Sequence, residues 1–475
     1  MKKTSVVLIF ISIFTCLLVL SSRHVTFAYW ESEEGRIYVT GWLENLTSVR
    51  LDDRPSAEPP LGYDGSYDAG DIQTFRNTLY IETNVKLSSN LDFFAISRAW
   101  WDASTTLDIN DLPDIIEDEH ASHRGPDMDS NIDLREWYLT ARAGDFTVKI
   151  GRQQVIWGEA DNIRIADVIN PLDVSWHYTF ESWEDIRIPL RMVNVMYEPN
   201  TENQFRLQLI WIPEDYRAWY WAPEGAPWAL PIPGLQMFWD QQGKELPDRH
   251  DFSNGEFGAR IQATVGDWEL SLFDFYSRVD NAVWKLDFGY FPIPYKFEWP
   301  RTNIIGGTFN VFNNLTGTVF RGECAYTMDQ PYTSALLNEI IEKDTVAFML
   351  GFDRPTMWTW INRRSFFISG QFYHKRILDY DSNIVSTDMS TDKTQSIVSL
   401  LINTTYRKDT IIPQFVGVVD FSGNGFLQPS IKYEPSDLWE ITLSANFIYG
   451  SSDDDGYYGP MRRNSEIFTR LRIKF

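Results

Sequence analysis

The chain has 475 residues, with 42 Lys and Arg against 66 Asp and Glu, a formal net charge of −24 and a pI of about 4.6. A surface this acidic excludes nucleic acid as a partner, because phosphate backbones bind basic proteins. Aromatic residues make up 15% of the chain, a share typical of outer-membrane β-barrels, which carry aromatic girdles at both membrane interfaces.

Residues 1–28 predict a secretory signal peptide. Lys2 and Lys3 precede an apolar run over residues 6–20, and small side chains end the segment at Ala28. The alternative is an N-terminal membrane anchor, but the run is shorter than the about 20 apolar residues that a spanning helix needs. We therefore expect an exported chain whose mature part is one domain over residues 29–475, with a charge of −27 because cleavage removes three basic residues and no acid.

Apolar and polar residues alternate with period two through most of the mature chain, which predicts half-buried strands. In residues 73–86, Phe75 and Leu79 share one face while Arg76 and Glu82 share the other. One face suits lipid and the other suits water. The eighteen candidate strands are 36–49, 73–86, 91–102, 133–142, 146–155, 190–198, 204–212, 256–265, 268–279, 302–313, 316–327, 344–353, 364–374, 394–406, 411–421, 426–434, 438–449 and 464–475.

The connections between these strands alternate in length. Those after even-numbered strands are mostly tight, and those after odd-numbered strands are mostly long, with 354–363 and 422–425 as exceptions. Short periplasmic turns and long extracellular loops alternate in this way in outer-membrane barrels. We therefore predict an all-β fold, a transmembrane antiparallel β-barrel of about 18 strands. A secreted β-sandwich or β-helix is the alternative, but it would not need a lipid-compatible face on nearly every strand.

The chain ends in an alternating strand, with Leu471, Ile473 and Phe475 on one face. An aromatic carboxyl-terminal residue on such a strand resembles the signal by which the barrel assembly machinery selects its substrates. Phe475 is therefore the expected assembly signal. This reading places the protein in the outer membrane of a Gram-negative cell, with outer-membrane lipid and lipopolysaccharide as its surroundings.

The stretch GRQQVIWGEADNIRIADVINPLDVSW, residues 151–176, follows an alternating strand and is densely polar. It resembles the signature of a domain-of-unknown-function family of bacterial outer-membrane barrels related to alginate-export-type porins. The resemblance rests on GRQ at 151–153, WGE at 157–159 and DVINPLD at 167–173. It implies a monomeric barrel that passes a solute across the outer membrane, with the substrate left open.

The segment after this strand is expected to fold into the barrel mouth and narrow it. Continuing the alternation would put Arg152 on the lipid face, so either Gly151 forms a bulge that turns Arg152 inward or the strand has already left the hydrocarbon. Residues 161–169 are expected to form one or two helical turns. Arg152, Arg164 or Arg187 would pair with Glu159, Asp161 or Asp167, and such pairs either select the solute or merely hold the loop together.

Arginines also recur on the inferred inner face, where glutamates of the same face offer partners, so the sign of any ion selectivity stays open. The predicted pore-lining and constriction residues are Arg152, Gln154, Glu159, Asp161, Arg164, Asp167, Arg187, Arg142, Arg206, Arg260 and Arg321.

Three further segments are rich in one kind of side chain. The aromatic and proline-rich loops 219–239 and 288–300 either bind a ligand or cover each other and close the barrel top. The acidic loop 115–133 imitates the start of a calcium loop, but Ile132 stands where the motif requires glycine. No metal site and no cofactor are therefore predicted, and no catalytic motif occurs.

These observations predict a porin or channel, not an enzyme, for a small or extended solute. The alternative is a plugged barrel that serves as a structural scaffold or docks a secreted or electron-carrying partner protein. The sequence leaves open the solute, the direction of transport, the ion selectivity and the oligomeric state.

Cleavage of the signal peptide is expected after Ala28, which leaves Tyr29 as the first residue. Amino-terminal sequencing and intact mass of the full-length protein, purified from outer membranes, measure this directly. A chain that retains Lys2 and Lys3 would favour the membrane anchor.

Overall fold

The structure is a computed structural model of the whole chain. It describes residues 30–32, 34–54, 67–106, 130–213, 216–223, 226–230, 245–248, 251–287, 295–336, 339–385, 392–451 and 456–475. Within these ranges, no helix has the length and apolar character to cross a membrane. The predicted signal peptide lies outside the described residues.

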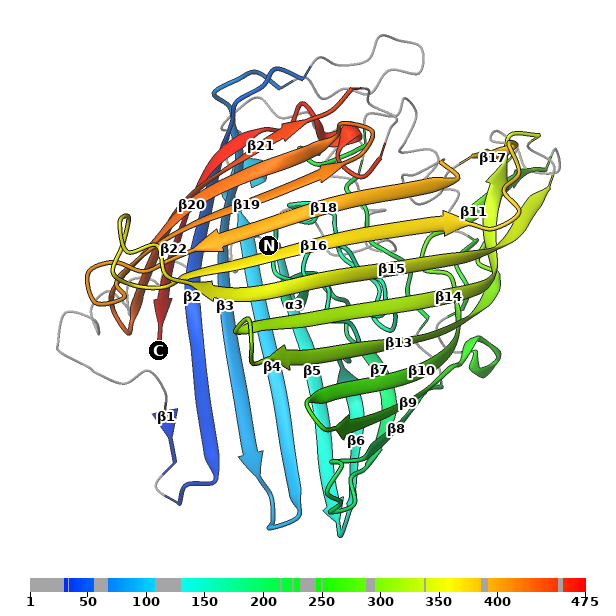
Figure 1. The fold of residues 1–475 in the computed structure, drawn as a ribbon, viewed down its shortest axis with the longest axis horizontal. Helices are drawn as coiled ribbons and strands as arrows, with labels where there is room; N and C mark the ends of the chain where they lie inside the picture. Colours follow the sequence, from blue (N-terminus) through cyan, green and yellow to red (C-terminus); the bar gives the residue numbers. More distant parts are fainter. Residues whose placement is uncertain are drawn as a thin grey trace.

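Eighteen antiparallel strands close into one barrel (Figure 1). Each strand pairs with its neighbour in sequence, and the last strand pairs with the first. The barrel strands are β2 (Ile37–Arg50), β3 (Ile72–Lys86), β4 (Leu91–Asp102), β5 (Ser130–Ala143), β6 (Phe146–Gln153), β7 (Leu190–Tyr197), β8 (Arg206–Ile212), β9 (Glu256–Val265), β10 (Trp268–Arg278), β13 (Arg301–Asn313), β14 (Thr318–Ser334), β15 (Ile340–Thr356), β16 (Phe366–Ile377), β18 (Thr394–Asn403), β19 (Ile411–Asp420), β20 (Gly425–Ser436), β21 (Trp439–Tyr449) and β22 (Glu466–Lys474).

The small elements are not part of this ring of strands. The short strand β1 (Trp30–Glu31) pairs with β2, and β17 (Ile384–Val385) pairs with the end of β14. The hairpin of β11 (Val283–Leu286) and β12 (Tyr295–Glu298) forms a separate sheet. The helical turns are α2 (Ala103–Thr106), α3 (Trp183–Ile186), η3 (Phe252–Asn254) and η4 (Gly459–Met461).

The predicted barrel and all eighteen predicted strands are confirmed. Alternation is the reason: on β10, Leu272 is 71% exposed on the outer face while Phe273 and Phe275 are buried in the lumen. The outer face is apolar on nearly every strand, with Asp274 as a charged exception on β10. Lipid can solvate such a face, whereas water would leave it as a large exposed apolar surface.

The alternation of connection lengths is also present, so the barrel has a short-turn end and a long-loop end. Both predicted exceptions remain, because β15 and β16 are joined by nine residues, 357–365, and β19 and β20 by four, 421–424. The predicted long connection 328–343 is wrong. After an irregularity between Thr327 and Gln330, pairing resumes and continues to Ser334, so only residues 335–339 connect β14 to β15.

Closure of the barrel joins β2 to the end of the chain. The backbone N–H of Gly41 donates to the carbonyl oxygen of Phe475 at 2.9 Å, and the N–H of Phe475 donates back at 2.9 Å. The ring of Phe475 lies against Gly41, where a Cβ atom would come within 2.8 Å of its Cζ and 2.4 Å of the Tyr80 carbonyl oxygen. Only glycine at position 41 therefore leaves room for the Phe475 ring against β2.

Gly41→Ala is expected to destabilise the barrel by about 1–3 kcal/mol, the usual cost of an extra methyl group in a packed site. The measurement is the urea concentration at which the refolded protein loses its heat-resistant gel mobility. Gly417→Ala on β19 is the matched control, because its Cβ atom would approach other atoms no closer than 3.3 Å. Equal midpoints for the two variants would contradict the closure argument.

Candidate functional site

The lumen is occupied by the connection between β6 and β7, residues 154–189, which we call the lumen segment. Asn170, which is fully buried, holds its two ends together. The Asn170 side chain accepts from the Val155 N–H at 2.8 Å and donates to the carbonyl oxygen of Ile188 at 2.9 Å. The side-chain amide of Asn170, in the DVINPLD stretch, thus joins the two ends of the segment where it leaves the wall.

Side chains of the opposite wall bind the backbone of the lumen segment. Glu323 of β14 accepts from the N–H groups of Glu159 and Ala166 at 3.2 and 3.3 Å. Gln371 of β16 accepts from the N–H of Asp161 at 3.1 Å. Residues 161–169 are therefore not helical, and the predicted helical turns are wrong. The N–H groups that a helix would use internally donate to the wall instead.

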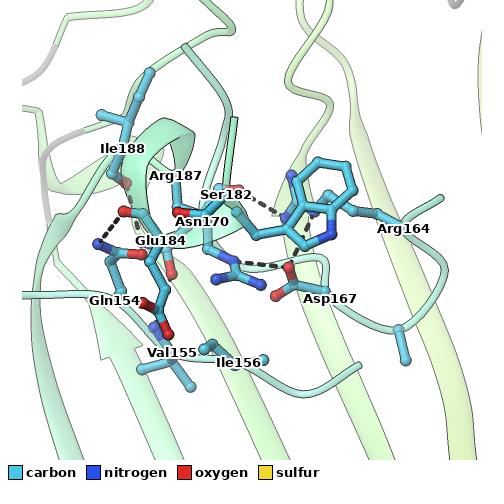
Figure 2. A network of polar contacts seen from close by, with 12 residues as sticks. Gln154, Val155, Ile156, Arg164, Asp167, Asn170, Ser182, Glu184, Arg187 and Ile188 are labelled. Carbon is cyan, nitrogen blue, oxygen red and sulfur yellow. Dashed lines mark hydrogen bonds and ion pairs between the residues drawn. The ribbon is translucent and has the colours of Figure 1, made fainter. Parts of the chain in front are cut away.

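Asp167 is the charged centre of the lumen segment and lies between two arginines (Figure 2). The Nε atom of Arg187 is 2.8 Å from its Oδ2 atom, and that of Arg164 is 3.3 Å from the same oxygen. All three side chains are nearly buried. The predicted pairing of Arg164 and Arg187 with Asp167 is thus observed, and one carboxylate serves two guanidinium groups.

The far turn of the segment is bound to the wall by a second ion pair. Arg321 of β14 contacts the Asp161 carboxylate at 2.5 Å and donates to the Glu159 carbonyl oxygen at 2.6 Å. Gln154, at the near end, donates to Glu136 of β5 at 3.0 Å. The segment therefore spans the lumen and is held at both sides.

Arg152 lies in the wall and is not among the lining residues of the three cavities described below. Its guanidinium contacts Asp133 at 2.9 Å and the Leu134 carbonyl oxygen at 3.0 Å. Of the two alternatives for Gly151, the bulge does not form, because β6 keeps its register with both neighbours through this residue. The irregularity lies in β5, where Arg135 has no partner in the pairing of β5 with β4.

The remaining predicted arginines lie in two separate places. Arg142 is half-exposed near the short-turn end and pairs with Asp92. Arg206 and Arg260 line a cavity together with Glu159, and Arg260 also donates to the Ser271 hydroxyl. Burial raises the pKa of the Glu159 carboxyl, although Arg260 and Arg321 oppose this effect. The structure thus brings Glu159 and two of these arginines together and leaves Arg142 outside the constriction.

A buried charged cluster in the lumen was not predicted from the sequence. His177 contacts Glu181 of its own segment and Glu466 of β22, each at 2.5 Å. Burial alone disfavours a charged ring, but Glu466 and Glu181 outweigh it and raise the pKa of His177 to about 9. Burial also favours the neutral form of Glu181, yet Arg470 and His177 lower the pKa of this carboxyl to about 2. The HxxxE spacing of His177 and Glu181 was the available signal, whereas Glu466 lies 289 residues away.

Three cavities surround the lumen segment. The largest, of about 710 Å³, includes Gln154 and reaches Arg472 near the short-turn end. A second, of about 370 Å³, includes Glu159 and Arg206 on the same side. The third, of about 250 Å³, lies toward the long-loop end and includes Arg164. The first two cavities lie on one side of the lumen segment and the third lies on the other.

Part of the aromatic loop predicted at 219–239 covers the lumen segment. Trp228 is 2% exposed and packs against His177 and Phe180. This arrangement supports the interpretation that the loop closes the barrel top. Residues 115–129 of the acidic loop, 231–239 and 288–294 lie outside the described residues. Among the residues that the structure describes, no group of three or more His, Cys, Asp or Glu side chains could hold a metal ion.

Comparisons with known proteins agree with the barrel. A model of the family described as "Protein of unknown function (DUF1302)" matches residues 9–475, whereas no curated protein matches the chain. The solved structure of OccK9 (OpdG) from Pseudomonas aeruginosa is similar, with a TM-score of 0.50 and 8% identity over 92% of this chain and 97% of that one. The structure of OccAB3 from Acinetobacter baumannii has a TM-score of 0.49 and 9% identity, over 92% of this chain and 98% of that one. The structure of OmpTdeltaL8, a loop L8 deletion mutant of the outer membrane protein OmpT of Vibrio cholerae, has a TM-score of 0.40 and 8% identity, over 92% of this chain and 99% of that one. The fold is thus that of a porin-like barrel, and the relation to alginate-export-type porins stays a prediction.

The His177 cluster is expected to make stability depend on pH. Because folding raises the pKa of His177 from 6.5 to about 9, its contribution of about 3 kcal/mol is fully present below pH 6.5 and is lost as the pH rises through 9. Thermal unfolding followed by tryptophan fluorescence should show a midpoint that falls between pH 7 and 10, and His177→Gln should flatten this fall. His374→Gln is the control, because His374 contacts Ser396 and no carboxylate among the described residues. Identical pH profiles for all three proteins would contradict the assignment.

Proposed function

We propose that this chain, which belongs to the DUF1302 family of proteins of unknown function, is an outer-membrane channel that passes small solutes around its lumen segment. The observation that carries the proposal is the arrangement of cavities. Spaces of about 710 and 370 Å³ lie on the short-turn side and one of about 250 Å³ lies on the long-loop side. A purely structural barrel would have no need for water-accessible, charge-lined spaces on both sides of a constriction.

Small movements of the lumen segment would join these spaces. The Arg321–Asp161 contact has a partly exposed carboxylate, and the Gln154–Glu136 bond borders the largest cavity. Both contacts are at the edge of the segment, whereas Asp167 is buried at its centre and Asn170 is buried where its two ends meet. The centre would therefore stay fixed while the edges open, which suits a narrow, selective passage more than a wide pore.

The proposal includes the position of the protein in the cell. The signal peptide over residues 1–28 would direct export. The barrel assembly machinery would recognise Phe475 before this residue forms its backbone hydrogen bonds with Gly41 of β2. Lipid and lipopolysaccharide would then contact the apolar outer face. A relation to alginate-export-type porins belongs to the same proposal, on the strength of residues 151–173, and no catalytic role is proposed.

One observation favours the second candidate function, a plugged barrel with a docking role. The lumen segment is bound at several separate places, and His177 and Asp167 lie at its buried centre. If the edges never open, the barrel is a scaffold, and its long loops would contact a secreted or electron-carrying partner protein.

Single-channel recording in planar bilayers separates the two candidates. The wild-type protein is expected to give small, steady openings, and Arg321→Gln is expected to raise the mean conductance at least twofold, because Glu159 and Asp161 lose the contacts that Arg321 makes with them. Arg142→Gln is the matched control, since Arg142 lines none of the three cavities described above and should leave conductance unchanged. Silent bilayers from wild-type and Arg321→Gln proteins that are both correctly folded would favour the plugged barrel.

A further inference from the structure

Two neighbouring connections at the short-turn end form one surface. They are residues 357–365, between β15 and β16, and residues 404–410, between β18 and β19, and we call them the paired turns. The side-chain amide of Asn362 donates to the Thr404 hydroxyl at 2.9 Å. The same hydroxyl donates to the Ser365 carbonyl oxygen at 3.0 Å. These bonds tie one turn to the other, so their side chains present a single surface.

The first of the paired turns begins at the outer rim of the wall. Gln371 and Tyr373 of β16 point into the lumen, where each accepts from a backbone N–H of the lumen segment. Alternation along β16 therefore places Phe366 on the outer face. The ring of Trp358 packs on Phe366 with 4.9 Å between the ring centroids, and Phe366 is buried. This turn thus lies against the lipid-facing side of the barrel.

The same turn exposes apolar side chains although backbone bonds hold it in shape. The N–H groups of Ile361 and Asn362 both donate to the Trp358 carbonyl oxygen, at 2.9 and 3.0 Å. Trp360 is nonetheless 83% exposed, Met357 58% and Ile361 43%. Such side chains at a lipid-facing rim suit the interface between acyl chains and headgroups, where tryptophan is enriched.

The short connections between barrel strands carry basic residues on the paired turns and nowhere else. These four basic residues are exposed, and they are Arg363, Arg364, Arg407 and Lys408. Asp409, which is 3.4 Å from Arg364, is the one acid on the paired turns. The other short connections have no basic residue and carry the acids Asp145, Glu198, Glu202, Asp267 and Asp437. Positive charge is thus concentrated at one place on an otherwise acidic rim.

The backbone of the second turn has a conformation that non-glycine residues rarely adopt. Arg407, Lys408 and Asp409 have φ angles of 49°, 60° and 69°, all in the left-handed region. The Thr405 hydroxyl donates to the Asp409 carboxylate at 2.5 Å, and the Thr410 hydroxyl donates to the Arg407 carbonyl oxygen at 2.9 Å. Strained backbone that neighbouring bonds maintain is frequent at ligand sites.

From this combination we propose that the paired turns bind anionic phospholipids of the membrane leaflet at the short-turn end, which is the periplasmic leaflet in outer-membrane barrels. Trp360, Met357 and Ile361 would lie beside the ends of the acyl chains nearest the headgroups. The four basic side chains would bind the phosphates, because clusters of Lys and Arg beside a membrane attract anionic lipid. An aromatic girdle would account for the indoles but not for the basic residues. The inference goes beyond the proposed channel function and needs only that the barrel spans a membrane.

Native mass spectrometry of the full chain in detergent tests the lipid class. Phosphatidylglycerol and phosphatidylethanolamine are added at equal, low concentrations, one of them with deuterated acyl chains so that the adducts differ in mass. Phosphatidylglycerol adducts are expected to be at least about threefold more abundant. Equal abundance would overturn the inference and would leave the paired turns to an acidic segment of a periplasmic protein.

A double variant, Arg363→Gln with Lys408→Gln, tests the location, because it removes two exposed charges and leaves the Arg364–Asp409 pair intact. The preference for phosphatidylglycerol is expected to fall at least twofold. The matched control is Arg36→Gln with Lys86→Gln, which removes two exposed charges beside β2 and β3 at the same end of the barrel and should leave the preference unchanged. A folded Arg363→Gln and Lys408→Gln protein with the wild-type preference would overturn the inference.

The two proposals fail separately. A protein that conducts ions in bilayers but shows no preference for phosphatidylglycerol keeps the channel and loses this surface. A protein whose preference depends on Arg363 and Lys408 but that stays silent in bilayers keeps the surface and loses the channel.

Discussion

The hydrogen bonds between wall side chains and the backbone of the lumen segment are the constraint on which the interior of this barrel depends. Irregular backbone enclosed by a barrel needs partners for its N–H and C=O groups, since unpaired buried groups are costly. Glu323 and Gln371 supply such partners from the wall, and Asn170 supplies them from within the segment. With these bonds satisfied, a chain without regular secondary structure can cross the lumen as a fixed partition.

The partition explains why so many ionisable side chains lie inside a membrane protein. Asp167 with its two arginines and His177 with its two glutamates are each enclosed, so every charge there needs a nearby opposite charge. Charges at the edge, such as Arg321 and Asp161, are more accessible and border the spaces that remain. The same division gives the lumen two acidic cavities on one side and a basic, aromatic cavity on the other.

Within the candidate site, local reasoning succeeded where the partners are close in sequence. The pairing of Arg164 and Arg187 with Asp167 could be predicted because all three lie on one connection. Arg152 was predicted at the constriction but lies in the wall. The alternation along one strand cannot show that its guanidinium reaches Asp133 on the neighbouring strand β5. The helical turns expected at 161–169 do not form, because acceptors on β14 and β16 bind N–H groups of this stretch. For His177 the sequence offered only its spacing to Glu181, because its other partner, Glu466, lies 289 residues away.

The sequence by itself determined the architecture. A wall with a lipid-facing side requires period-two alternation of apolar and polar residues on its strands, and a barrel with two different ends requires connections of alternating length. Both patterns can be recognised in the sequence. The tertiary structure alone decided which side chains meet in the lumen. His177 reaches Glu466 over 289 residues and Asp161 reaches Arg321 over 160, and such contacts depend on strand register and closure at Gly41 and Phe475. Register and closure are properties of all eighteen strands together, so no local stretch of sequence contains them.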